Sequence, residues 1–509
     1  MYFLNKAKSR AGAFKRGSGK LKLAIMFLVV VNLSVMTLPT WFNYSALQLV
    51  LAMLLLDVCL YPTFRYVARG ETGLPVLPAL CMSFAVQYSL PILTQESKVI
   101  LAGGELRYVE DGAMGMALLM AIVGVCLLQV AYYLLRDLKV GPTIPMANLH
   151  LSEQKAEMFC IGVFVLYFLS GRLQSLLPED SALQFQSIFF LLQNQLLVAI
   201  GILAWLTFKV RKRKRHLAML IVIVFLAALR GFSTTMMEMM IVPLAVLFIA
   251  KWTYTQKIPW VSLATIALAF LFFSPVKLDI RQSMRGEIPG QQQVQNRAQD
   301  WVKSGAQFWG ETFAGKRPLE ESTADASSRT DLIHSFGHVY SLTPSVVPYQ
   351  YGSTYSYLAI AWVPRLIWPE KPTANYANDF YAIEYGISTE EAVKTSSFGV
   401  TLMGEGFINF GPMGVGMIMI LLGVVLSLME RVFGTERSGV GGQAVFLAVF
   451  VSFLNGIGSS AEQMFGGLVQ NLICSAFLIA WARGVPSISR LQKLRFAGLI
   501  HGRVTLDSD

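Results

Sequence analysis

Long apolar stretches alternate with short polar ones along most of this chain, and the alternation predicts a series of membrane-spanning helices. A helix needs about 20 mainly apolar residues to cross a hydrocarbon core roughly 30 Å thick. Twelve stretches approach this length: 22–38, 45–63, 74–94, 112–134, 157–176, 185–208, 217–235, 236–250, 258–276, 409–428, 441–459 and 465–482. The stretch 217–250 is short for two spans, so a single kinked segment remains an alternative there. The expected fold is an all-α polytopic membrane protein of about twelve transmembrane helices.

One long polar stretch, 277–408, interrupts this pattern before the last three spans. It divides the chain into three expected regions. These are an N-terminal membrane region of about nine spans (1–276), a loop domain (277–408), and a C-terminal membrane region with a basic tail (409–509).

Within the loop domain, residues 291–314 carry apolar side chains at helical spacing, which predicts an amphipathic helix. The apolar positions are Val294, Ala298, Trp301, Val302, Gly305, Phe308, Trp309 and Phe313. We expect this helix to lie on the membrane surface or to cap the outer ends of the spans. A platform of aromatic rings for a sugar is the alternative.

A second helix is expected from the capping box Ser328-Arg329-Thr330-Asp331 to about Tyr340. At 100° per residue, His334 and His338 share one face with Asp331, opposite an apolar face. The i, i+4 spacing would suit a metal, but no third ligand stands nearby and the H-E-x-x-H pattern is absent. A general base, a phosphate contact and a solvated helix face remain the other interpretations.

Prolines and aromatic residues crowd the segment 348–372, which makes it unsuitable as a spanning helix. We expect 353–363 to form a short re-entrant or interfacial helix that presents Arg365 and Lys371. Arginine binds phosphate in a planar, bidentate way, whereas lysine offers a point charge. Snorkelling of either side chain to the membrane interface is the alternative.

Composition supports a membrane protein, because 54% of the residues are apolar, only 14% are charged, and the mean hydropathy is +0.52. The excess of 42 Lys/Arg over 31 Asp/Glu is concentrated in alternate loops, for example six basic residues in 209–216. By the positive-inside rule, both termini are then cytoplasmic and 277–408 is periplasmic. The same excess therefore indicates cytoplasmic loops rather than nucleic-acid binding. The five cysteines all fall in apolar stretches, with no disulfide framework or C-x-x-C site.

Two ionisable residues at the spans are candidates for function, because a charge is costly in a bilayer. Arg230 lies toward the outer end of its span, where it would reach phosphate or pair with Glu238. Glu405 stands among glycines where the loop domain re-enters the membrane, with no structural reason evident from the sequence. A carboxylate at that boundary would be able to take a proton from a sugar hydroxyl.

Taken together, these motifs resemble one family. They are Arg230 before a long outer loop, Pro348, Tyr349, Gly352, Thr354-Tyr355, Val363-Pro364-Arg365, Trp368-Pro369, Lys371-Pro372, Gly404-Glu405-Gly406, Asn409-Phe410-Gly411 and Gly414. In this set the chain resembles the bacterial oligosaccharide repeat-unit polymerases, which include the Wzy-type O-antigen and exopolysaccharide polymerases. The likeness covers roughly 230–416, and outside it only the number of spans compares.

The resemblance implies a GT-C-like membrane glycosyltransferase that uses neither a nucleotide sugar nor a metal. Such an enzyme joins oligosaccharide repeat units linked to undecaprenyl diphosphate, on the periplasmic side of the bacterial inner membrane. A chain-length regulator and a flippase are then candidate partners. The positions that would bind diphosphate or substrate are Arg230, Arg281, Arg285, Arg329, Arg365, Lys371 and Tyr355.

Fixed cations would stabilise the departing diphosphate, and a base would activate the acceptor hydroxyl. Glu405 is the first candidate for that base, and His334 or His338 the second. Three alternatives remain open, one of them a non-catalytic assembly subunit whose outer loop docks a partner. An O-antigen ligase differs only in its acceptor, and a transporter or flippase of lipid-linked oligosaccharide would spread its cations through a central cavity.

Overall fold

Helices make up nearly all regular structure in the part of the chain that the computed structural model describes. Those residues are 44–71, 73–94, 98–102, 105–137, 149–210, 214–234, 237–257, 259–277, 280, 294–316, 331–361, 363, 367, 368, 370–372, 375–393, 398–435 and 438–484. Every predicted apolar stretch within these ranges forms a helix, and only 22–38 lies outside them. The expected all-α architecture is confirmed, with one two-stranded ribbon added to it.

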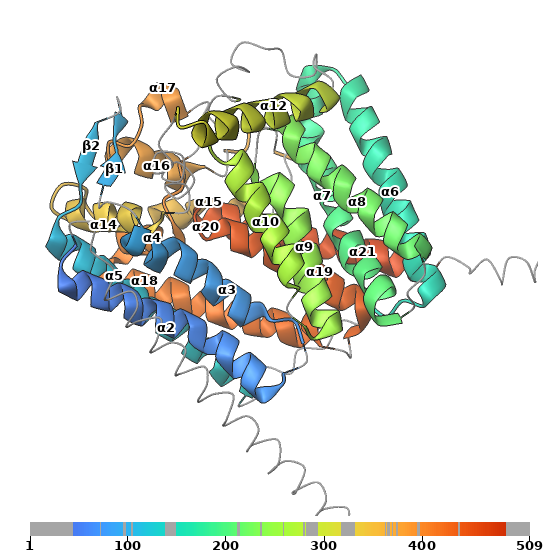
Figure 1. Ribbon diagram of the computed structural model, residues 1–509, viewed down its shortest axis with the longest axis horizontal. Helices are drawn as coiled ribbons and strands as arrows, with labels where there is room; N and C mark the ends of the chain where they lie inside the picture. Colours follow the sequence, from blue (N-terminus) through green and yellow to red (C-terminus); the bar gives the residue numbers. More distant parts are fainter. Residues whose placement is uncertain are drawn as a thin grey trace, which may run out of the picture.

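The long helices pack in two groups (Figure 1). The first group contains α2 (Ala46–Arg69), α3 (Val76–Phe84), α5 (Asp111–Asp137) and α18 (Leu402–Met429). The second contains α6 (Glu153–Leu176), α7 (Glu179–Trp205), α8 (Lys214–Thr234), α9 (Met237–Thr255), α10 (Trp260–Phe273), α19 (Gly439–Gly456) and α21 (Leu468–Gly484). The close approach of α18 to α5 depends on Gly423, where an added Cβ would lie 2.5 Å from the Leu128 carbonyl oxygen.

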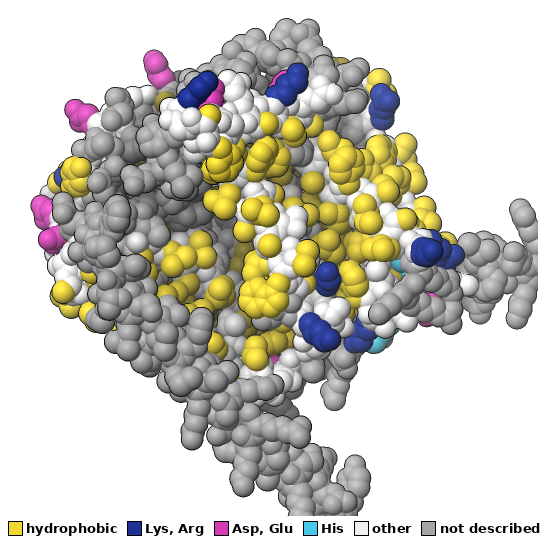
Figure 2. All heavy atoms as spheres, in the orientation of Figure 1, with side chains coloured by type: hydrophobic (Ala, Val, Ile, Leu, Met, Phe, Trp, Pro, Cys, Tyr) yellow, Lys and Arg dark blue, Asp and Glu magenta, His cyan; other side chains and the backbone are white. Residues whose placement is uncertain are grey.

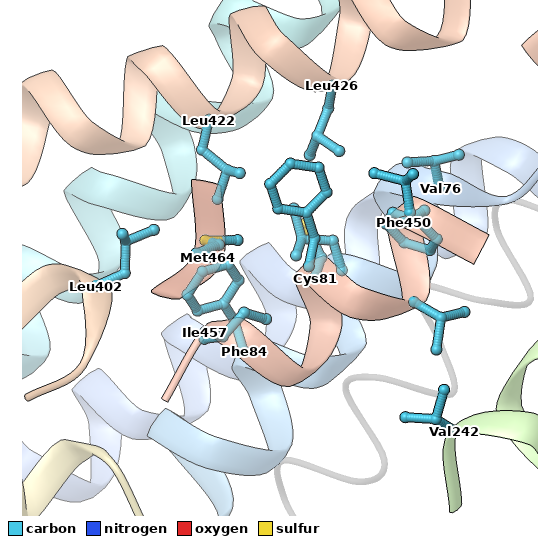
Figure 3. Packing of buried hydrophobic residues seen from close by; sticks show 14 of the residues in the cluster. Val76, Cys81, Phe84, Val242, Leu402, Leu422, Leu426, Phe450, Ile457 and Met464 are labelled. Atoms are coloured by element: carbon cyan, nitrogen blue, oxygen red, sulfur yellow. The ribbon is translucent and has the colours of Figure 1, made fainter. Parts of the chain in front are cut away.

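A continuous apolar core joins the two groups (Figure 3). Phe84 of α3 and Leu422 of α18 lie in it together with Phe450 of α19, and all three are essentially inaccessible to solvent. Contact between α3 and α19 makes the same link between the groups. The two groups are therefore parts of one packed unit.

Seven helices in the described ranges are long and apolar enough to cross a membrane. They span Ala46–Arg69, Val76–Leu93, Asp111–Asp137, Glu153–Gln174, Ile188–Val210, Leu402–Gly434 and Ala461–Gly484. Figure 2 shows hydrophobic side chains over the middle of one face, with Lys and Arg gathered toward its two ends. An apolar belt between charged ends is what a bilayer requires, and the protein is an all-α membrane protein.

The structure decides how many helices 217–250 forms, and it moves the start of the span expected at 409–428. The stretch 217–250 forms two separate helices, α8 and α9, that pack along each other, which answers the question of one kinked segment. The span expected at 409–428 begins at Leu402, because Thr401 accepts a hydrogen bond from the backbone N–H of Gly404 and caps the helix. Glu405 therefore lies in the first turns of α18 rather than ahead of it.

The polar stretch after α10 folds into short elements over one end of the helices. These are α12 (Val294–Phe313), α14 (Ile333–Leu342), the 3₁₀ turn η4 (Ser353–Tyr355), α15 (Ser356–Ile360), α16 (Tyr376–Glu384) and α17 (Glu390–Val393). The ribbon β1 (Lys98–Ile100) and β2 (Leu106–Tyr108) lies beside them (Figure 1). We call this end of the molecule, covered by α12 to α17 and the ribbon, the capped end.

The amphipathic helix predicted at 291–314 is present as α12 and crosses α8 and α10, as the capping interpretation expected. Trp301 and Phe308 are buried against the ends of the spans. Phe313, on the same predicted apolar stripe, is 80% exposed. Only part of the stripe is therefore covered by protein.

Candidate functional site

At the capped end, Glu405 lies at the centre of a hydrogen-bonded cluster that joins three segments. Its Oε1 accepts a hydrogen bond from the Thr354 hydroxyl at 2.9 Å, and its Oε2 accepts one from the backbone N–H of Ala461 at 2.6 Å. The Asn409 side chain donates to Thr354 Oγ1 at 2.7 Å and to the Glu405 carbonyl at 2.8 Å. We call Thr354, Glu405, Asn409 and the N–H of Ala461 the Glu405 cluster.

The segment before Thr354 is tied to the same helix by its backbone. Gln350 and Tyr351 donate their N–H groups to the carbonyls of Ile408 and Asn409, at 3.0 and 3.2 Å. Asn409 Oδ1 accepts from the N–H of Gly352 at 2.8 Å. The segment 350–354 is therefore fixed against the first turns of α18 by backbone hydrogen bonds, and its own backbone forms a turn.

A kink in α18 makes room for this arrangement. Gly411 has φ +61° and ψ −147°, a conformation open to glycine alone, and Pro412 follows it without an N–H. The Tyr349 hydroxyl occupies the space beside Gly411, 3.0 Å from where a Cβ would stand. The kink thus depends on the Gly-Pro pair and on the fit of one tyrosine.

Glu405 has no exposed surface, so its carboxylate depends on these donors. No structural reason for Glu405 is evident from the sequence, and the structure supplies one. The side chain holds the start of α20 (Ala461–Phe465) and the 350–354 segment against α18. Its role as a base remains a prediction, and both of its oxygens are already engaged.

A second cluster at the capped end contains Asp331, His334 and Tyr44. The Asp331 carboxylate is hydrogen-bonded to Nδ1 of His334, and its other oxygen accepts from the His334 backbone N–H at 3.2 Å. Nε2 of His334 lies 2.6 Å from the Tyr44 hydroxyl. With its Nδ1 proton directed at a carboxylate, the imidazole presents the Nε2 lone pair to that hydroxyl. This is the arrangement of a base with its orienting carboxylate.

His338, one turn later on α14, has a different setting. Its Nε2 donates to the carbonyl of Tyr385 at 2.9 Å, and the residue is 1% exposed. Burial lowers the pKa of His338, so the ring is neutral near pH 7. His334 is equally buried, which overturns the solvated-face interpretation of both histidines. That interpretation failed because α14 packs between α5 and α18.

No group of three or more His, Cys, Asp or Glu in the described ranges could hold a metal ion. The start of α14 also differs from the prediction. The helix begins at Ile333, and Asp331 receives the hydrogen bond from its first turn. Ser328 and Thr330 of the expected capping box lie outside the described residues.

Lys371 and Tyr355 both belong to the polar stretch after α10, with Tyr355 at the end of η4 and Lys371 after α15. Nζ of Lys371 donates to the carbonyls of Ala361 and Val363, at 2.9 and 3.0 Å, and the side chain is buried. Lys371 therefore fixes the backbone at Ala361 and Val363, just after α15. Burial raises the pKa of Tyr355, and the nearby Glu405 charge raises it further. Tyr355 is thus a neutral neighbour of the Glu405 cluster.

The side chains of the remaining predicted phosphate ligands lie outside the described part of the structure. Arg281, Arg285, Arg329 and Arg365 lie outside the described residues. Arg230 belongs to α8, but its side chain is also outside the description. Their roles remain predictions.

Sequence reasoning missed two members of the capped end. Tyr44 precedes the first described helix and is 290 residues from its partner His334, so no local pattern connects them. Glu462, in the first turn of α20, is 1% exposed and accepts from the N–H of Ala377 at 3.0 Å. Its position at the predicted outer end of a span was a usable signal, since a buried carboxylate there is costly.

Comparison with known proteins gives one result. A family model described as a domain of unknown function, DUF8712, matches residues 142–484. The chain belongs to the DUF8712 family. The matched region includes parts of all three expected regions and both clusters except Tyr44. No curated protein and no solved structure matches the chain.

Proposed function

We propose that the protein is a GT-C-like membrane glycosyltransferase that polymerises oligosaccharide repeat units carried on undecaprenyl diphosphate. In this proposal about twelve helices span the bacterial inner membrane, both termini are cytoplasmic, and the capped end faces the periplasm. The reaction needs no nucleotide sugar, because the donor glycan already carries its diphosphate leaving group.

One observation supports the proposal most. Two of the segments that carry the family resemblance, 348–355 and 404–414, meet in the Glu405 cluster. Tyr349 packs on Gly411, Gly352 is hydrogen-bonded to Asn409, and Thr354 to Glu405. Residues that serve a common site are expected to converge in this way.

Each part of the reaction has a candidate group among the residues that the sequence singles out. The departing diphosphate gains negative charge, and arginines stabilise it in a low-dielectric site. Arg230, Arg281, Arg285, Arg329 and Arg365 are the candidates, whereas Lys371 is already engaged with backbone carbonyls. The acceptor hydroxyl must lose a proton to a base.

The contacts favour His334 over Glu405 as that base. Both Glu405 oxygens accept hydrogen bonds that hold the fold together. The His334 imidazole is oriented by Asp331, and its Nε2 faces a hydroxyl group. We propose that the acceptor proton reaches His334 through the Tyr44 hydroxyl and that Glu405 acts as a positioning residue.

The test is glycan lengthening by the purified protein in lipid bilayers. The substrate is a synthetic repeat unit on undecaprenyl diphosphate, with no nucleotide sugar added. We expect a ladder of products from the natural sequence and about a hundredfold less from Arg365→Ala, the order expected for loss of one electrostatic contact to the transition state. Lys316→Ala, which removes an exposed cation after α12, is the matched control and retains activity.

Two results would contradict the proposal. The first is no lengthening by the folded natural protein, with the glycan moved instead to a lipid A acceptor, which indicates a ligase. The second is transfer of intact lipid-linked glycan between leaflets without lengthening, which indicates a flippase. Unchanged activity of Arg365→Ala would reject that arginine as a diphosphate ligand.

A further inference from the structure

A cavity of about 340 Å³ lies among α6, α7, α9, α19 and α21, beside the Glu405 cluster. This volume falls within the range of small-molecule sites, about 300–1,000 Å³. Its wall runs from Tyr167 and Phe190 on α6 and α7 to Ser459 in the turn between α19 and α20. The cavity thus reaches from the apolar interior of the bundle to the capped end.

The lining has an unusual chemistry for the interior of a helix bundle in a membrane. Among the described residues, no Asp, Glu, Lys, Arg or His lines the cavity. Three of its side chains are serines and five are carboxamides: Gln193, Asn194, Gln195, Gln463 and Asn471. Carboxamides both donate and accept hydrogen bonds, as the hydroxyl groups of a sugar do.

The carboxamide of Asn194 indicates that the cavity holds a polar ligand. Asn194 lies inside the candidate span Ile188–Val210 and is partly exposed to the cavity. Its carboxamide has no hydrogen-bond partner among the described residues. An amide without a partner is costly within the thickness of a bilayer. A polar ligand in the cavity would satisfy it.

The polar side of the cavity is connected to the capped end. Gln463, which lines the cavity, is hydrogen-bonded to Asn375 of the segment before α16 and to Ser459. Both Gln463 and Ser459 adjoin Ala461, whose N–H is held by Glu405. One wall of the cavity is therefore fixed by the same cluster that organises the candidate active site.

From these observations we propose that the cavity binds an uncharged sugar residue of the lipid-linked glycan. This deepens the proposed function by naming the substrate class, and it rests on that function for the source of the sugar. A diphosphate or a uronic acid would find no cation in the described lining. An isoprenoid chain would leave the Asn194 carboxamide facing hydrocarbon, whereas the other four carboxamides are already hydrogen-bonded within the protein. Aromatic side chains such as Phe190 supply the apolar surface on which a sugar ring packs.

Photochemical capture tests this binding without requiring turnover. Phe190, which lines the cavity, is replaced by p-benzoylphenylalanine in the full-length protein. Phe168 of neighbouring α6 receives the same group as a control, since it is 45% exposed and does not line the cavity. Three tritiated probes are compared: undecaprenyl diphosphate carrying a neutral hexose trisaccharide, the same lipid carrying a uronic acid trisaccharide, and the lipid without sugar.

We expect capture of the neutral probe at position 190, at least several-fold above the other two probes and above position 168. Asn194→Leu should lower this capture about tenfold, as loss of one hydrogen bond predicts. Thr265→Val, which removes a hydroxyl from the exposed face of α10, should leave it unchanged. Thermal unfolding of each variant checks that the fold is retained.

Equal capture of the lipid without sugar would show that the cavity holds isoprenoid, and it would overturn the proposal. Preference for the uronic acid probe, or no capture of the neutral probe, would overturn it as well. The polymerase is tested separately by glycan lengthening. A protein that lengthens glycan but captures no sugar at position 190 rejects the cavity alone, and one that captures sugar without lengthening rejects the polymerase alone.

Discussion

At the scale of single residues, a buried polar group is understood through its partners. Glu405 is the clearest case, because its two carboxylate oxygens accept hydrogen bonds from residues 51 and 56 positions away in the chain. Neither donor can bind water instead, because Thr354 and Ala461 are themselves buried. The carboxylate is thus part of the fold at the capped end.

Replacing Glu405 tests this role. Glu405→Ala should lower the free energy of unfolding by roughly 2–4 kcal/mol, because the Ala461 N–H and the Thr354 hydroxyl both lose an acceptor. Glu405→Gln should cost less, since its carbonyl oxygen still serves Ala461 and the Thr354 hydroxyl can accept from its amide.

Thermal unfolding in detergent ranks the variants, with Glu384→Ala at an exposed site of α16 as the control. Glycan lengthening by Glu405→Gln should also persist, because His334 is the proposed base. Loss of activity in a fully stable Glu405→Gln protein would return the catalytic role to Glu405.

At the scale of elements, α18 shows how local sequence and packing share control. Hydrophobicity predicts a helix here, and the pair Gly411-Pro412 breaks its hydrogen-bond ladder. The break matters only because the 350–354 segment fills it, with Tyr349 against Gly411. The part of α18 before the kink therefore belongs to the candidate site, and the part after the kink belongs to the membrane span.

Gly411→Ala should lower the free energy of unfolding by about 1–3 kcal/mol, because φ +61° with ψ −147° is strained for any residue with a Cβ. Adding Tyr349→Phe should recover little, since it removes the close hydroxyl but not the backbone strain. Gly115→Ala in α5, where an added Cβ meets nothing within 4 Å, is the matched control and should be neutral or slightly stabilising. Equal effects of the two alanine variants would mean that the kink carries no strain.

At the scale of the whole molecule, the capped end and the apolar belt define an orientation. The capping elements contact the ends of α8 and α10 and the start of α18, which the charge pattern assigned to the periplasmic side. The basic clusters of the sequence belong to the opposite side by the positive-inside rule. Packing therefore brings together helix ends that the charge pattern assigns to one side of the membrane, and the periplasmic orientation stays a prediction of the charge pattern.

Cysteine labelling in intact cells measures this orientation. Ser345→Cys, exposed at the capped end, should react with a membrane-impermeant maleimide without permeabilisation. Lys257→Cys, exposed between α9 and α10, should react only after permeabilisation. The native protein, whose described cysteines are buried or half-buried, gives the background. The opposite pattern would place the capped end in the cytoplasm and remove the basis for the proposed reaction.

The sequence by itself determined where the helices are, because a run of apolar residues long enough to cross a bilayer is a local property. It also predicted α12 from its apolar stripe, and it grouped residues from Tyr349 to Gly414 by their resemblance to one family. Only the tertiary structure decided that Glu405 is held between Thr354 and Ala461, and that His334 meets Tyr44. It also decided that both histidines are buried and that neutral amides line a cavity. These features depend on contacts between distant segments, which form only when the capping elements pack onto the ends of the helices.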